Sequence, residues 1–424
     1  MPDLSLADYL AEEWKPALGC TEPASIAYAA SSAAKHLSGE IKRVTLRCDP
    51  RIYKNCYAVG IPHSGHKMGI RWALAIGALL PDPSAQLECF EQTDQAILDK
   101  AAKLIEDGAL KIQVRPECEE LFIECKLTNS LGHVAQARIQ REHTRLTFLA
   151  VDEKIIAEEK LDEGVDHRSM RADLACLGFA DLAKMARAAS EQDRALLREG
   201  MDINLAIAQH GLGLFPKRFV DMDGEDSMTR ISRRVCAGVY ARMCGEDFVV
   251  MSLAGSGNKG ITCSVPLALF GKEEGLDPKR VEEALALACL VTSATTHHLG
   301  TLSAVCGCSN AAGIGLSAGL VLLEGGDEAA ISRAVNNMVG NVTGMICDGA
   351  KIGCALKTMT AVDSAFRATS LAMSGIGIPV SDGIVGTDGQ ESLANMGRMA
   401  TVGMASADAE ILAIMQEKLD RDGS

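Results

Sequence analysis

The sequence is poor in positive charge, in aromatic residues and in long apolar runs. Its 42 Lys and Arg residues are outnumbered by 56 Asp and Glu residues, which gives a net charge of −14, and only 4% of the residues are aromatic. Nucleic-acid binding relies on clustered basic side chains that neutralise phosphates, so this balance argues against a nucleic-acid partner. The most apolar run, residues 311–323, is too short to cross a bilayer.

A secretory signal is also missing, because the first residues, MPDLSLADYLAEEW, are acidic and amphipathic rather than basic and then apolar. We therefore expect a cytoplasmic protein with no membrane partner. Hydrophobic residues make up 47% of the chain and charged residues 23%, which is typical of a compact globular protein. A length of 424 residues is sufficient for two or three domains.

Cysteine, in contrast, is abundant, with 15 residues. A disulfide scaffold is typical of small secreted domains, and this chain is long and has no export signal, so we expect mostly reduced thiols. A free cysteine usually behaves as a small buried hydrophobic residue. The pair in CDGAKIGC, residues 347–354, has a spacing that arises easily by chance at this cysteine frequency, so spacing alone assigns it no role.

The pattern along the chain predicts an α+β fold in three parts. Residues 1–39 form an N-terminal helical segment that packs on the catalytic domain, 40–165 a small α+β subdomain, and 166–424 a large, mostly helical domain that holds the catalytic site. In the second part, strands are expected at 41–48, 111–117, 121–127, 133–140 and 145–151, and helices at 71–80 and 97–108. The charged segment 151–170 is the best candidate for a domain boundary.

The segment GCTEPASIAYA predicts a helix that begins directly after Cys20. Thr21 is a suitable cap, Glu22 and Pro23 suit the first turn, and Gly39 can end the helix. A thiol before a helix N-terminus is expected to have a lowered pKa. From the residues alone, Cys20 remains a candidate ligand, general base or buried residue.

Two Gly-containing segments are candidate substrate contacts. Residues 248–266 place G-x-G-x-x-G after a plausible strand, but ITCSVP is a poor helix start and no βαβ pattern surrounds it, so a dinucleotide site is not expected. Its turn amides, with Ser256, Asn258 and Lys259, would suit a small carboxylate, and a plain turn is an equal alternative. The second segment, 51–69, resembles a loop in which Lys54 and Asn55 either contact substrate or lie in a surface turn.

Three cysteines form a candidate ligand set for one site. Cys308 precedes the predicted helix start SNAAG, and Cys347 and Cys354 follow with glycines that allow close approach of a bulky inorganic group. Lys351 would offset the charge of a thiolate-bound cluster. A cluster held by three cysteines leaves one iron open for substrate, which is the arrangement of a catalytic rather than a structural metal site.

Five motifs occur in an order that resembles a known family. GCTEPASIAYA, YKN…VGIP, GSGNKGI, CGCSNAAG and MICDGAKIGCALK are similar to segments of the iron–sulfur L-cysteine desulfidases, which are bacterial proteins similar to the serine dehydratase α chain. The resemblance extends over essentially the whole chain. Five motifs in order are far more specific than any one of them.

The resemblance implies a [4Fe–4S] enzyme that eliminates sulfide from L-cysteine and releases pyruvate and ammonia. By motif, Cys308, Cys347 and Cys354 correspond to the cluster ligands, and Cys20 corresponds to the residue that moves the Cα proton. The positions expected to contact the amino-acid substrate are Thr21, Glu22, Lys54, Asn55, Ser256, Asn258 and Lys259. A homo-oligomer is left open.

The sequence leaves the substrate and two details of the site open. The related iron–sulfur serine dehydratases have a longer gap between the last two cysteines and a Ser-Ser-His-Thr segment in place of GCTEP, which favours the desulfidase over an L-serine dehydratase. Cys306 competes with Cys308 as a ligand, and Cys56 stands where the family has a small residue. A pyridoxal-phosphate lyase with Lys259 or Lys351 as the imine-forming residue is a rival hypothesis, and a non-catalytic cluster-binding sensor is another.

Overall fold

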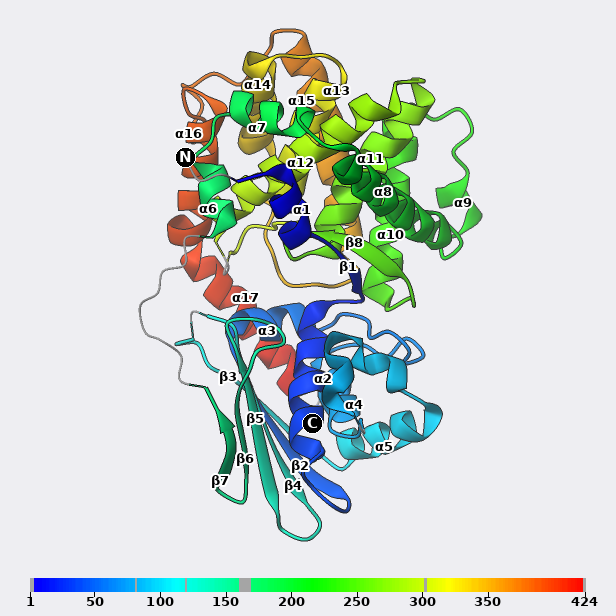
Figure 1. Ribbon diagram of the computed structural model, residues 1–424, viewed down its shortest axis with the longest axis vertical. Coiled ribbons are helices and arrows are strands. Elements are labelled where there is room, and N and C mark those ends of the chain that lie inside the picture. The colour runs from blue at the N-terminus through cyan, green and yellow to red at the C-terminus, as the bar shows by residue number, and fades with distance from the viewer. Residues whose placement is uncertain (1–3, 81, 119, 160–168, 301–302, 422–424) are drawn as a thin grey trace.

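The computed structural model describes residues 4–80, 82–118, 120–159, 169–300 and 303–421. A helical part and a smaller part built on a sheet lie one above the other (Figure 1). The predicted α+β class is confirmed. The boundary expected between residues 165 and 166 lies outside the described residues.

The smaller part is built on a six-stranded sheet with the order β3-β2-β4-β5-β6-β7. Only β2 and β3 are parallel, and the other neighbours are antiparallel. The strands are β2 (Ile41–Cys48), β3 (Leu110–Val114), β4 (Phe122–Asn129), β5 (Val134–Gln140), β6 (Leu146–Val151) and β7 (Lys154–Glu158). The five predicted strands are confirmed. In β2, for example, the alternating apolar residues Val44 and Leu46 are buried on one face of the sheet. β7 was missed, since all five of its residues are exposed at the sheet edge.

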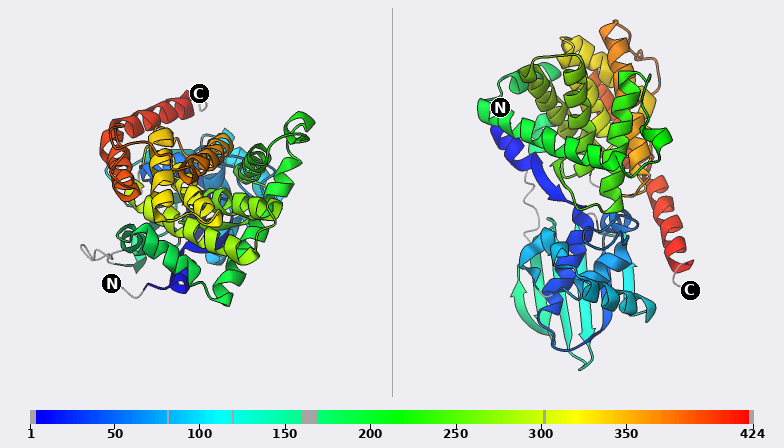
Figure 2. Two further views of the ribbon diagram at one scale, coloured as in Figure 1. Left: turned by 90° about the horizontal axis from the view of Figure 1, so that it is seen from above. Right: turned by 90° about the vertical axis from the view of Figure 1, so that its right-hand side faces the viewer.

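Helices cover one face of this sheet (Figure 2). They are α2 (Thr21–Ala34), α3 (Pro50–Cys56), α4 (Ile70–Gly77), the 3₁₀ segment η1 (Pro83–Gln92) and α5 (Gln95–Glu106). The prediction that residues 51–69 form only a loop is wrong at its start. Asp49 accepts hydrogen bonds from the N–H groups of Arg51 and Ile52, and Pro50 occupies the first turn, so α3 is a capped helix.

The larger part is almost entirely helical. Its elements are α1 (Leu6–Glu13), α6 (Met170–Ala175), α7 (Phe179–Arg187), α8 (Glu191–Leu212), α9 (Lys217–Val220), α10 (Ser227–Cys244), α11 (Gly257–Glu273), α12 (Pro278–Leu299), α13 (Asn310–Leu323), α14 (Glu328–Val342), α15 (Cys354–Met373), α16 (Gly389–Arg398), the π-helical turn η2 (Met399–Gly403) and α17 (Ala405–Arg421). Among the described residues, no helix combines the length and apolarity needed to cross a membrane.

A two-stranded antiparallel ribbon joins the N-terminus to the middle of the chain. It consists of β1 (Trp14–Leu18), a strand inside the N-terminal segment that was expected to be helical, and β8 (Val249–Leu253), which is the strand expected before the Gly-rich turn. α11 follows that turn directly and includes ITCSVP, so the prediction that this segment is a poor helix start is wrong. Pro266 lies inside α11 and is surrounded by buried residues, whose packing offsets the one backbone hydrogen bond that a proline removes.

Two apolar cores meet near the start of α2. Cys20 belongs to the core of the helical part, whereas Ala24, one turn later, belongs to the core of the sheet part. The C-terminal helix α17 also crosses between the parts: it descends from the helical part to lie beside α3, and its Met415 is buried in the sheet part's core (Figure 1).

Candidate active site

Cys20 lies at the point where the two cores meet. It is the N-cap residue of α2, with an extended backbone and a side chain that caps no N–H group. The prediction that a helix begins directly after Cys20 is confirmed, although Thr21 is the first helical residue rather than the cap. The Cys20 sulfur is therefore available to contact groups from other elements.

A buried arginine of α10 links Cys20 to the Gly-rich turn before α11. Arg242 is 5% exposed and donates hydrogen bonds to the Asn258 side-chain oxygen at 2.9 Å and to the Gly19 carbonyl at 2.7 Å. Its charge also acts on the neighbouring Cys20 thiol. The GCTEP and GSGNK motifs, far apart in the sequence, are thus joined through one guanidinium group.

The expected low pKa of Cys20 is not found. Burial raises the pKa of Cys20 to about 11; the Arg242 charge and hydrogen bond oppose this rise, while Glu22 and Cys308 add to it. Burial outweighs the helix dipole because the thiol is almost fully removed from water. If Cys20 acts as a base, it therefore depends on its one cationic neighbour.

The first turn of α2 carries a small polar cluster. Asn55 donates to one Glu22 carboxylate oxygen at 3.0 Å, and Thr21 donates to the other at 3.2 Å. Burial alone would raise the pKa of Glu22, but His143, Arg51 and the hydrogen bond from Asn55 outweigh burial and lower it. Glu22 is therefore an ionised carboxylate close to Cys20, suited to an ammonium group.

The two cysteine-rich segments lie side by side. Residues 304–306 and 345–347 are held by an isolated antiparallel bridge, in which the Cys306 N–H donates to the Met345 carbonyl and the Cys347 N–H donates to the Ala304 carbonyl. Cys354 begins α15, and its thiol faces the Gly349 carbonyl at 3.5 Å. The structure thus brings the CGCSN and CDGAKIGC motifs together.

These thiols also interact electrostatically. The neighbouring Cys306 thiol lowers the pKa of Cys347, against the effect of burial, and Lys54 and Lys357 lower it further. Burial raises the pKa of Cys354 to about 12, and the negative charges of Cys308 and Cys347 contribute to this rise. Such mutual repulsion between thiolates requires a compensating positive charge at the same place.

Cys308 lies against the Gly-rich turn. Its sulfur is 3.3 Å from the Ser256 hydroxyl, and Lys259 is close enough to oppose the rise that burial causes in its pKa. Lys259 is buried, and its ammonium group donates to the Ala254 carbonyl at 3.2 Å and to the Thr296 hydroxyl at 3.0 Å. Burial, together with the charge of Arg171, lowers the pKa of Lys259 to about 8.

The cysteine side chains fit an iron–sulfur group by their chemistry rather than by a preformed geometry. In the described ranges, no group of three or more His, Cys, Asp or Glu side chains is arranged to hold a metal ion. Four cysteines nevertheless interact with one another next to Lys54 and Lys259, as the thiolates of a cluster site would. The buried Asn310 side-chain oxygen, two residues after Cys308, also has no hydrogen-bond partner.

Lys54 of α3 lies near the cysteine-rich segments and already has an ion-pair partner. Its ammonium group contacts the Asp408 carboxylate of α17 and donates to the Ser303 carbonyl at 3.3 Å, and the side chain is 3% exposed. The Lys54 charge also acts on Cys347. Lys54 therefore connects α3, α17 and the thiol segments, and it is not a free surface cation.

Gly349 permits the contact between CDGAKIGC and α3. Its φ is +94°, and an added Cβ would lie 1.9 Å from the Lys54 carbonyl oxygen. We predict that Gly349→Ala lowers the free energy of unfolding by roughly 2–5 kcal/mol, the sum of about 1–2 for the positive φ and about 1–3 for the clash.

The matched control for this substitution is Gly353→Ala. Gly353 has an ordinary helical backbone, and its Cβ would approach no atom closer than 4.0 Å. This change should leave the free energy of unfolding in urea unchanged or raise it by up to about 1 kcal/mol. Equal losses for the two variants would show that Gly349 has no special contact.

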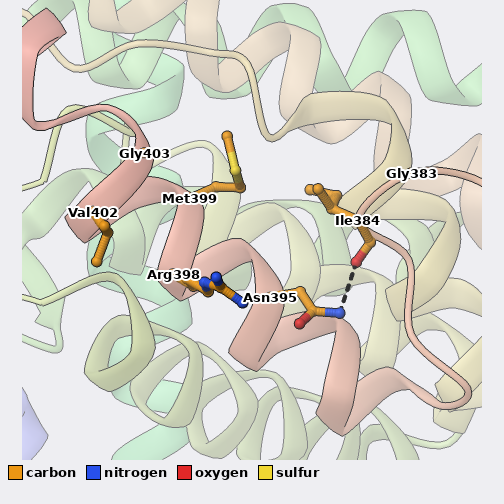
Figure 3. A pocket seen from close by; sticks show the side chains of 7 residues that line it. All are labelled: Gly383, Ile384, Asn395, Arg398, Met399, Val402 and Gly403. Carbon is orange, nitrogen blue, oxygen red and sulfur yellow. Dashed lines mark hydrogen bonds between the residues drawn. The ribbon is translucent and has the colours of Figure 1, made fainter.

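A surface hollow elsewhere lacks these features. It has a volume of about 410 Å³ and lies beside the C-terminal end of α16, where Asn395 donates to the Ile384 carbonyl at 3.0 Å (Figure 3). Arg398 is its one charged lining residue, and none of the expected site residues lines it. The side chains expected to act in catalysis or ligand binding lie instead near the junction of the two parts.

The structure adds three residues that the sequence did not single out. Arg242 and Asp408 contact predicted site residues, and His143 acts electrostatically on Glu22 from the loop between β5 and β6. The buried Nε2 atom of His143 has no hydrogen-bond partner, and its carbonyl accepts a hydrogen bond from Ser25. No local motif marks these three positions, because their partners are distant in the sequence.

Comparisons with known proteins agree with this arrangement. Residues 91–413 match the family model described as serine dehydratase alpha chain. A UPF0597 protein of Caldanaerobacter subterraneus is 35% identical over 98% of this chain and 99% of its own, and one of Geobacter sulfurreducens is 34% identical over 97% and 98%. A UPF0597 protein of Clostridium perfringens is 33% identical over 96% and 97%. The resemblance seen in the sequence is confirmed at the level of the family: the chain belongs to the serine dehydratase α-chain family.

Proposed function

We propose that the protein is a [4Fe–4S]-dependent lyase that converts L-cysteine to sulfide, pyruvate and ammonia. The proposal rests on one observation: the two cysteine-rich segments lie side by side and contact the Gly-rich turn. The Cys308 sulfur lies 3.3 Å from the Ser256 hydroxyl of that turn. A second thiol, Cys20, lies within electrostatic range of Cys308. This supports an arrangement in which three thiols act as ligands and a separate thiol, that of Cys20, transfers the proton.

Cys308, Cys347 and Cys354 would hold the cluster, and Lys54 and Lys259 would offset its negative charge. When bound, a cluster with an open iron supplies a Lewis acid for the sulfur of the substrate. The Cys306 thiol donates a hydrogen bond to the Ser309 hydroxyl at 3.4 Å, which is a reason to prefer Cys308 as the third ligand.

The chain's own residues would bind the amino-acid groups and move the proton. Ionised Glu22, held by Asn55 and Thr21, would bind the substrate ammonium group. Lys259, with Ser256, Asn258 and the turn amides, would bind the carboxylate. The Cys20 thiolate would accept the Cα proton, so that the C–H electron pair forms the Cα–Cβ double bond and the Cβ–S bond breaks. The aminoacrylate released would hydrolyse in water to pyruvate and ammonia.

L-Serine is the second candidate substrate. The family model is described as serine dehydratase, and the hydroxyl group of serine occupies the position of the cysteine thiol. Iron that already has soft sulfur ligands binds a thiolate in preference to a hydroxyl group. The segment Cys20–Glu22 also differs from that expected of a dehydratase. L-Cysteine is therefore the preferred substrate.

The test compares the two substrates on anaerobically reconstituted protein. We expect pyruvate from both, with a higher kcat/KM for L-cysteine, and iron and sulfide in the protein. A higher kcat/KM for serine would make the protein a dehydratase. Absorbance that borohydride alters, in an iron-free active sample, would instead indicate pyridoxal phosphate, and iron without turnover would indicate a sensor.

A further inference from the structure

Arg242 is buried without a carboxylate partner. In the part of the chain that the structure describes, no Asp or Glu forms an ion pair with it, and it donates hydrogen bonds to the neutral oxygens of Gly19 and Asn258. Its Nε atom is buried and has no acceptor. Because a buried charge is costly unless it is paired, this guanidinium group needs a counter-charge that the carboxylates do not supply.

The groups placed to supply that charge are thiols. Arg242 donates to the carbonyl of Gly19, the residue before Cys20, at 2.7 Å, and its charge acts on the thiols of Cys20 and Cys308. Its two hydrogen bonds fix the guanidinium, and Gly257 leaves room for it, because an added Cβ there would lie 2.5 Å from the Nε atom. Arg242 is thus held between the start of α2 and the start of α11, beside Cys20.

We propose that Arg242 is a positioning residue that holds Cys20 beside the turn 255–258, through the Gly19 carbonyl and the Asn258 side chain, and serves as the counter-charge of the Cys20 thiolate. The catalytic part of this inference, the role of Arg242 in proton transfer, rests on the proposed function. When the Cys20 thiolate accepts the Cα proton, an S–H bond forms. The C–H electron pair becomes the Cα–Cβ double bond, and the electron pair of the Cβ–S bond leaves with the sulfide. Arg242 acts on this step through Cys20 and does not itself contact the substrate.

The first readout is the rate at which iodoacetamide alkylates Cys20 at one mildly alkaline pH, followed by peptide mass spectrometry on the anaerobically reconstituted protein. Arg242→Gln should slow this reaction by about tenfold or more, because an adjacent opposite charge shifts a pKa by about 1–3 units. Arg242→Lys, which keeps the charge but cannot reach both acceptors, should slow it less. In turnover, Arg242→Gln should lower kcat with little change in KM.

Two controls separate this role from a merely structural one. Loosening of the fold would expose Cys20 and Cys236, a buried thiol of the same helix as Arg242, and would speed the alkylation of both. The charged or titratable groups that act on Cys20 are Arg242, Glu22 and Cys308. Glu22→Gln removes a negative neighbour and should therefore speed alkylation of Cys20 alone.

Unchanged or faster Cys20 alkylation in Arg242→Gln would overturn the proposal. If this variant does not fold, Arg242→Lys decides: a rate and a kcat equal to those of the unmodified protein would also overturn it. The alkylation requires no turnover. A slowed Cys20 reaction in a protein inactive on cysteine would refute the proposed function and leave the role of Arg242 standing.

Discussion

Replacing Cys20 with alanine should lower kcat for L-cysteine by about 10²–10⁴-fold, which is the usual effect of removing a general base. The iron and sulfide content of the reconstituted protein should stay unchanged, because Cys20 lies at the start of α2, outside the two paired cysteine segments. The measurement combines steady-state sulfide release with iron analysis on the same preparation.

Cys89→Ala is the matched control for Cys20. Cys89 is a fully buried cysteine of the sheet part, and its thiol donates to the Ala24 carbonyl, away from the cysteine-rich segments. Its removal should leave kcat nearly unchanged. Loss of iron from Cys20→Ala would identify Cys20 as a ligand, and an unchanged kcat would refute its role in proton transfer.

Replacing any one of Cys308, Cys347 and Cys354 with alanine should remove most of the bound iron and abolish turnover. Three thiolates are the least that would hold a cluster with one open iron, so the loss of one ligand cannot be compensated within the set. The expected result is a protein that folds, as judged by circular dichroism, but retains little iron after anaerobic reconstitution and desalting.

Two further cysteines make this experiment specific. Cys289 is fully buried in α12, outside the paired segments, and Cys289→Ala should keep its iron. Cys306→Ala should also retain iron, since the Cys306 thiol is assigned as a hydrogen-bond donor to Ser309 rather than as a ligand. If Cys306→Ala loses iron and Cys308→Ala keeps it, the assignment of the third ligand is reversed.

Local patterns in the sequence were sufficient for much of the fold. The alternation in β2 and in β3 to β6, and the start of α2 after Cys20, follow from residues close together in the chain. β1 was missed because Pro16 argues against a strand, yet it lies in a two-stranded ribbon opposite Met251. α3 was missed because its seven residues stand in a segment rich in glycine and histidine.

The site depended more on tertiary contacts. Arg242 donates to a carbonyl 223 positions away, and Lys54 pairs with an aspartate 354 positions away, so no spacing rule could connect them. The pKa of Cys20 was predicted in the wrong direction for the same reason. The helix start is a local feature, whereas the burial that raises the pKa arises only where the two cores meet.

Sulfide release from L-cysteine by anaerobically reconstituted protein tests the central claim most directly. Sulfide should appear together with an equal amount of pyruvate, and both should disappear in Cys20→Ala and in Cys347→Ala. A fully iron-loaded wild-type protein that releases neither product, or a metal-free protein that releases both at the same rate, would contradict the account.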